Sequence, residues 1–195
     1  MIIWINGAFG SGKTQTAYEL HRRIPDSFVY DPENVGYYIR ENIPKQITKS
    51  DFQDYYLWRE MNFSMLKYIA TEYSGTIIVP MTIVNPDYFR EIAGELREED
   101  FEIQHFTLCA SRETLLKRLR SRGEGKNSWA AQQIDRCLRG LENDIFQYHL
   151  DTEKLSTEEV AETIALMLDI SLLPVSKRAW SRFLQRIKIL IEYIR

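Results

Sequence analysis

The chain has little cysteine and no long apolar run. Its two cysteines, Cys109 and Cys137, lack the spacing of a metal-ligand or redox pair. Its apolar segments stay well short of the ~20 residues that a spanning helix needs. No basic segment precedes the apolar residues 2–5, as one would in a signal peptide. These absences argue against a disulfide scaffold and a membrane-spanning protein, and they favour a cytoplasmic one.

Positive charge is scarce over most of the chain and is concentrated at its end. The formal net charge is −3, but residues 174–195 hold six Lys and Arg residues against one acid, a local charge of +5. This leaves −8 for residues 1–173. An acidic body argues against a nucleic-acid partner, because phosphate backbones attract clustered cations. The basic tail indicates a contact that the body does not make.

Apolar residues alternate between short β-rich runs and longer helical stretches. The short runs predict strands at 2–6, 28–31, 76–79 and 103–108, with a weaker one at 148–150. The longer stretches predict helices at 14–23, 51–73, 86–99, 112–122, 128–141 and 157–168, and another that begins near Glu33. This alternation predicts a three-layer α/β domain over residues 1–173, in which helices cover both faces of a parallel sheet.

The strongest motif directly follows the first expected strand. Residues 7–14 read GAFGSGKT, a complete G-x-x-x-x-G-K-T between a strand and a helix. In such a loop several amide groups converge on phosphate oxygens, and the next helix adds its positive end. The expected nucleotide-binding residues are Gly7, Gly10, Ser11, Gly12, Lys13 and Thr14. Lys13 would reach the β- and γ-phosphates of ATP, and the Thr14 hydroxyl would be a ligand of Mg²⁺.

A candidate catalytic acid stands at the end of the second expected strand. The apolar run 76–79 is followed by Pro80 rather than by an aspartate, so a motor or switch NTPase fits poorly. Asp31 is the nearest acid at a strand end, and there it could accept a proton from an acceptor hydroxyl. The alternative is that Asp31 only caps the turn before the helix near Glu33.

A second basic group predicts a mobile cover over residues 118–130. Arg118 and Arg122 are four residues apart on one helical face, and the glycine-punctuated loop 123–127 follows them. The cover could place one guanidinium on the phosphates and another over the adenine ring of ATP. Alternatively, these cations only favour the dipole at the end of their helix. Arg136 is a weaker candidate of the same kind.

The acceptor is expected between the second and third strands. This region is rich in aromatic residues and contains two arginines, which would suit a uracil ring and polar sugar groups. The substrate-binding candidates are Tyr37, Arg40, Trp58 and Arg59, and Arg59 is preferred. The alternative is that most of these aromatic side chains pack the helices onto the sheet.

Several segments together resemble a known family. The L-x-x-R-L-x-x-R pattern at 115–122, with the loop 7–14 near the N-terminus, resembles the nucleoside-monophosphate and shikimate kinases. Residues 1–14, 30–33, 78–84 and 124–131 resemble the bacterial tunicamycin-resistance ATP-binding proteins. This resemblance implies an ATP-binding, kinase-like fold, resistance to a nucleoside antibiotic, and membrane association through a C-terminal amphipathic helix. It does not distinguish modification of tunicamycin from sequestration.

The tail carries an amphipathic pattern with a basic polar side. Trp180, Phe183, Leu184 and Ile187 begin an apolar stripe that continues to Ile194 at helical spacing. A helix over 174–195 could lie peripherally on an anionic membrane, on the inner face of the cell membrane, or could dock on the core of its own domain.

Three functions are compatible with these patterns. The first is a phosphotransferase that modifies tunicamycin with ATP and Mg²⁺. The second is a module that captures tunicamycin when nucleotide orders the cover. The third is a metabolic kinase for a nucleotide, a nucleotide sugar or another hydroxyl acceptor.

Overall fold

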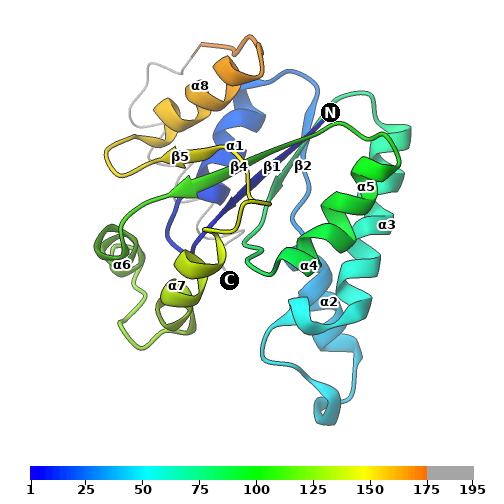
Figure 1. Ribbon diagram of the computed structural model, residues 1–195, viewed down its shortest axis with the longest axis vertical. Coiled ribbons are helices and arrows are strands. Elements are labelled where there is room, and N and C mark those ends of the chain that lie inside the picture. Colours follow the sequence, from blue (N-terminus) through cyan, green and yellow to red (C-terminus); the bar gives the residue numbers. More distant parts are fainter. Residues whose placement is uncertain (175–195) are drawn as a thin grey trace.

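The computed structural model describes residues 1–174 and shows a five-stranded sheet (Figure 1). The strands are β1 (Ile2–Gly7), β2 (Ser27–Val29), β3 (Thr76–Pro80), β4 (Ile103–Cys109) and β5 (His149–Asp151). Their order across the sheet is β2-β3-β1-β4-β5, and each neighbouring pair is parallel. The strand β1 is therefore central, and the loop that follows it leaves the middle of the carboxyl edge.

Helices cover both faces of the sheet (Figure 1). They are α1 (Lys13–Arg23), α2 (Glu33–Asn42), α3 (Tyr56–Glu72), α4 (Pro86–Phe89), α5 (Glu95–Glu98), α6 (Arg112–Arg120), α7 (Trp129–Gly140) and α8 (Thr157–Met167). The α1 and α8 helices pack together on one face, whereas α2 to α5 lie on the other. The α6 and α7 helices lie beyond the carboxyl end of β4 (Figure 1).

The alternation of side chains along β1 explains the two-sided core. Ile2 and Trp4 belong to the cluster beneath α3 to α5, and Ile3 and Ile5 belong to the cluster beneath α1 and α8. All six residues of β1 are buried. Each fully buried apolar side chain of this kind contributes roughly 1.5–3 kcal/mol to folding. The central strand is thus the best-anchored base that the fold offers for a functional loop.

The predicted three-layer α/β fold is confirmed, with local corrections. The predicted helix 51–73 is wrong at its start: a 3₁₀ turn occupies Phe52–Asp54, and the extended Tyr55 separates it from α3. The predicted helix 86–99 is continuous in space, but its middle turn, Arg90–Gly94, is a π-helix. Beyond residue 174, the predicted tail helix lies outside the described residues. Over residues 1–174, none of the helices has the length and apolar character needed to traverse a bilayer.

Candidate active site

The loop between β1 and α1 is built on glycines with positive φ. The φ angles are 148° at Gly7, 83° at Gly10 and 100° at Gly12, a region that side chains disfavour. A Cβ at Gly7 would lie 2.8 Å from the Leu108 carbonyl oxygen, and one at Gly10 would lie 2.8 Å from that of Leu115. These two glycines let the loop fold down against β4 and α6.

The same loop is open where a ligand would enter. A Cβ at Gly12 would meet no atom within 4 Å, so space lies directly above the first turn of α1. The Ser11 hydroxyl oxygen is buried without a hydrogen-bond partner among the described residues. The Lys13 Nζ donates to the Ala8 carbonyl at 3.1 Å, across the mouth of the loop. This cradle fits a phosphate chain, and the half-buried Thr14 at its edge fits a role as a Mg²⁺ ligand.

Lys13 lies in a desolvated and strongly charged neighbourhood. Burial lowers its pKa to about 8, and Arg122 lowers it further, whereas Glu33, Cys137 and Asp31 oppose this shift. Lys13 also lies over the Phe9 ring, 5.6 Å from its centroid. The structure therefore places Lys13, Asp31 and Arg122, three of the predicted catalytic residues, in one electrostatic neighbourhood.

Asp31 follows β2 at the carboxyl edge of the sheet. Burial raises the pKa of its carboxyl group to about 7, and the neighbouring Glu33 adds to this shift. Its Oδ1 also accepts a hydrogen bond from the Glu33 amide at 3.0 Å. The capping role and the position beside Lys13 thus coexist, because one oxygen holds the turn while the carboxyl group as a whole is poised to exchange a proton near neutral pH.

Glu33 belongs to the site, although sequence analysis treated it only as a helix start. It is the strongest charged neighbour of Lys13, and burial raises the pKa of its carboxyl group. The Tyr37 hydroxyl donates to Glu33 Oε2 at 3.3 Å, one turn further along α2. The signal that could have found Glu33 is its position two residues after Asp31, in the first turn of a helix that begins at the carboxyl edge.

The predicted cover contacts the phosphate loop through aromatic rings. Phe9 of the loop packs edge-on against Trp129 at the start of α7, with ring centroids 5.1 Å apart. Arg118 donates from Nη2 to the Thr152 carbonyl at 2.6 Å, so its guanidinium lies by the segment after β5. Arg122 instead lies near Lys13, where burial lowers the pKa of its guanidinium. The two arginines therefore reach different parts of the site.

The acceptor candidates are largely engaged inside the protein. Trp58 is 0% exposed and donates from Nε1 to the Pro32 carbonyl at 2.9 Å, so its ring offers no surface to a substrate. In this respect the structure favours the packing alternative. Arg40 donates to the Ser50 carbonyl at 2.8 Å and stacks on Phe52 at 5.2 Å. Its buried Nε has no partner among the described residues.

Arg59 is held by four partners. It pairs with Glu91 of the π-helical turn and donates to the Gln53 carbonyl at 2.6 Å. Its guanidinium also lies 4.2 Å from the Tyr88 ring centroid and 5.9 Å from that of Tyr56. Its side chain is 11% exposed. A substrate could contact Arg59 only in competition with these partners.

An ion pair joins the acceptor side to α7. Arg136 donates from Nη2 to Asp51 Oδ2 at 2.8 Å, and the Asp51 side chain is buried whereas that of Arg136 is half-exposed. Arg136 thus lies toward the segment 51–53, not beside Arg118. Neither partner could be linked to the other from sequence, because 85 residues separate them.

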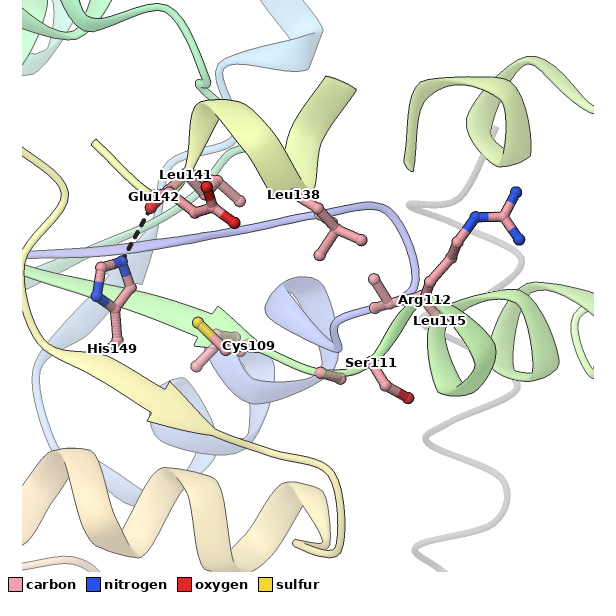
Figure 2. A pocket seen from close by; sticks show the side chains of 11 residues that line it. Cys109, Ser111, Arg112, Leu115, Leu138, Leu141, Glu142 and His149 are labelled. Atoms are coloured by element: carbon pink, nitrogen blue, oxygen red, sulfur yellow. Dashed lines mark hydrogen bonds between the residues drawn. The ribbon is translucent and has the colours of Figure 1, made fainter. Parts of the chain in front are cut away.

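Two cavities adjoin this region. One of about 360 Å³ lies behind the loop and shares Ala8 with it. Figure 2 shows Cys109, Leu115 and Leu138 between a polar end at His149 and Glu142 and the Arg112 side chain opposite. None of the predicted site residues lines this cavity. The second, of about 300 Å³, lies between β2, α2 and α3, and Asp31 is among its lining residues.

Comparison with known proteins relates the chain to P-loop proteins. The AAA domain family (AAA_33) matches residues 2–143. The chain is 35% identical to the Deinococcus radiodurans tunicamycin resistance protein, and the match covers 89% of this chain and 99% of that chain. The two structures superpose with a TM-score of 0.75. A search of curated protein sequences found no match.

More distant structures share the fold. A sugar kinase from a Janibacter species superposes with a TM-score of 0.60 at 18% identity, over 87% of this chain and 94% of that one. The Acinetobacter baumannii shikimate kinase in complex with shikimate superposes with a TM-score of 0.55 at 15% identity, over 86% and 93% of the two chains. The fold is therefore that of P-loop kinases.

Proposed function

The chain belongs to the P-loop, kinase-like family of the tunicamycin resistance protein, and from this premise we propose that it uses Mg·ATP to phosphorylate a nucleoside antibiotic of the tunicamycin class. One observation supports this most. An open phosphate cradle, with Lys13 at its mouth, lies beside a carboxyl group whose pKa is raised to about 7. A carboxyl group at this place suits the transfer of a phosphoryl group to a hydroxyl, because it can accept the proton of that hydroxyl.

The loop 7–14 supplies the nucleotide half of the proposed site. Its amides and the N-terminal end of α1 would hold the phosphates, and Lys13 would leave the Ala8 carbonyl to neutralise them. The Thr14 hydroxyl would serve as a Mg²⁺ ligand. When bound, Mg·ATP supplies the phosphoryl group and a divalent charge. Arg122 adds a second cation near Lys13, while Arg118 would stack on the adenine ring beside the segment at Thr152.

Asp31 supplies the acceptor half with a base. In its ionised form the carboxylate would accept the proton of the attacking hydroxyl as the new O–P bond forms and the bond to the ADP leaving group breaks. Its Oδ1 contact with the Glu33 amide fixes the orientation of the carboxylate. Tyr37, Arg40 and Arg59 are the proposed acceptor contacts, and Trp58 supports them from the core.

The test is mass spectrometry of tunicamycin after incubation with the protein and Mg·ATP. We expect the drug to gain one phosphoryl group, and Lys13→Met to abolish the gain. Lys117→Met, which removes an exposed cation of α6, is the matched control and should keep it. Unmodified drug that co-purifies with the protein in the presence of ATP would instead support capture. Drug that is neither modified nor bound would favour a metabolic kinase.

We also propose that residues 174–195 bring the protein to an anionic membrane surface. The proposal is based on the local charge of +5 and on the apolar stripe of this segment. The full chain should sediment with vesicles that contain anionic lipid, whereas a chain that ends at Leu173 should stay in the supernatant. Equal sedimentation of both would contradict it, and insolubility of the shortened chain would show that the tail packs on its own domain.

A further inference from the structure

The first residue of the phosphate loop is clamped by the segment that follows β3. Asn6 Oδ1 accepts from the amides of Gly7 at 2.8 Å and Ile83 at 3.0 Å, and Asn6 Nδ2 donates to the Ile83 carbonyl at 2.8 Å. The Thr82 hydroxyl donates to the Gly7 carbonyl at 2.9 Å. Asn6 is 0% and Thr82 is 2% exposed. Thr82 therefore holds the Gly7 carbonyl directly, and Asn6, which is itself bonded to Ile83, holds the Gly7 amide.

A buried glutamine extends this clamp toward the acceptor side. Gln53, which is 5% exposed, donates from Nε2 to the Thr82 carbonyl at 2.9 Å. The backbone N–H of Gln53 in turn donates to Asp51 Oδ1 at 3.1 Å. The other oxygen of Asp51 accepts from Arg136 on α7. Each step of this network is a hydrogen bond, and apart from the one between Asp51 and Gln53 it links residues that lie far apart in the sequence.

The chain of contacts has a physical consequence. A buried donor or acceptor that loses its partner costs about 1–3 kcal/mol, so water cannot replace the Thr82 or Gln53 bonds without loss. A shift of segment 51–53 is therefore passed to Thr82 or breaks a buried bond. The half-exposed Arg136 is the end of this network that a ligand can reach, and Gly7, the first residue of the proposed phosphate loop, is the other end.

We propose that Thr82 and Gln53 are positioning residues of the phosphate loop, through which the Arg136–Asp51 pair sets how tightly the loop binds a triphosphate. The inference rests on the proposed nucleotide site at residues 7–14. It gives the acceptor side a route to that site, because a ligand that draws Arg136 away from Asp51 changes the order of the loop.

A double-mutant cycle tests this coupling. Arg136→Met should weaken the binding of Mg·ATP about fivefold, which is the loss expected for roughly one hydrogen bond. Thr82→Val should cause a similar loss, and the double variant should lose no more than Thr82→Val alone. Isothermal titration calorimetry gives the affinities. Thr82→Ser, which keeps the hydroxyl, should restore both the affinity and its response to Arg136→Met.

Hydrogen exchange provides a readout that needs no nucleotide. The Gly7 and Ile83 amides, which share Asn6 Oδ1, should exchange faster in Arg136→Met than in the parent. In the Thr82→Val background, the Arg136→Met substitution should not change their exchange rates further. The matched control is Arg112→Met. It removes another α7 ion pair, Arg112–Asp135, whose N–O distance is also 2.8 Å but whose side chains are exposed.

Two results would overturn the proposal. One is an Arg136→Met protein whose affinity and amide exchange equal those of Arg112→Met. The other is losses that multiply in the double variant, since independent effects add in free energy. If Thr82→Val does not fold, Gln53→Met breaks the next contact of the chain and takes its place. A parent chain that binds no Mg·ATP would refute the proposed function, and the exchange rates would still decide whether the loop is positioned in this way.

Discussion

The proposed nucleotide half of the site, at residues 7–14, and its proposed acceptor half, around Tyr37 to Arg59, differ in how far the protein satisfies its own polar groups. In the nucleotide half, the Ser11 hydroxyl has no partner among the described residues, space lies above Gly12, and Lys13 donates to one carbonyl and lies over the Phe9 ring. In the acceptor half, Trp58 is buried in the core and Arg59 has four partners, although the Arg40 Nε has none among the described residues. The loop 7–14 thus offers open groups to a ligand, whereas a ligand of Trp58 or Arg59 would have to compete with existing contacts.

This difference teaches which residues can act directly. A group that is already open or weakly held can bind a ligand at little cost, but a buried pair that loses one partner leaves the other charge uncompensated. An acceptor would therefore contact Arg59 only at the cost of one of its present interactions. Asp31 lies between the two halves, and burial together with Glu33 raises the pKa of its carboxyl group to about 7.

The largest effect is expected from Asp31→Asn. The amide keeps an oxygen for the Glu33 amide, so the turn should persist, but it cannot accept a proton. Loss of a general base lowers a rate by about 10²–10⁴-fold, and we expect a fall of that size in phosphorylation of tunicamycin with unchanged affinity for Mg·ATP. Single-turnover kinetics measures the rate, and Asp144→Asn, at an exposed site, is the control. Turnover by Asp31→Asn at the rate of the parent would contradict the proposed base and show that Asp31 only caps the turn before α2.

A smaller effect is expected on the free energy of unfolding when the contacts of the acceptor half are removed. Arg59→Ala breaks an ion pair, a hydrogen bond and a stacking contact, and should lower the free energy of unfolding by about 1–3 kcal/mol. Arg90→Ala removes an exposed pair with Asp87 and should change it by no more than ~0.5 kcal/mol. Urea unfolding compares them. Equal stability of both variants would mean that the acceptor half is not held by its internal contacts.

The smallest effect is a pH dependence of nucleotide binding. Below its pKa of about 8 Lys13 is charged in the free protein, and a bound triphosphate favours that charged form. Binding must therefore take up a proton above pH 8, and affinity should fall there by at most about tenfold per pH unit. Calorimetry between pH 7 and 9.5 measures this, in a range where phosphate groups, with a second pKa of about 6, are ionised.

The matched variant for that experiment is Lys13→Arg. A guanidinium stays charged throughout this range, so any residual binding should lose its dependence on pH. A parent protein whose affinity is flat up to pH 9.5 would show that burial does not lower the pKa of Lys13, and the nucleotide half would then be less desolvated than the structure indicates.

Sequence patterns predict those parts of this molecule that depend on residues close together in the sequence. The loop 7–14, the parallel sheet and the position of Asp31 follow from motif and periodicity. The partners of Arg59 and Trp58 do not, because Glu91 and Pro32 meet them only after the chain has folded. The break at Tyr55 in the predicted helix 51–73 likewise does not follow from the sequence pattern. The Asp51 side chain accepts from the Gln53 backbone amide, and this local hydrogen bond competes with the helix that the apolar spacing of the segment favours.

The order of the strands has a consequence for how the molecule responds to heat. The outer strands β2 and β5 contain three residues each, and each pairs with one neighbour, whereas β1 contains six and pairs on both sides. Fraying should start at the rims of the sheet and reach the middle last. On warming, the proposed acceptor side, which adjoins β2, should therefore lose its structure before the loop 7–14 at the end of β1 does.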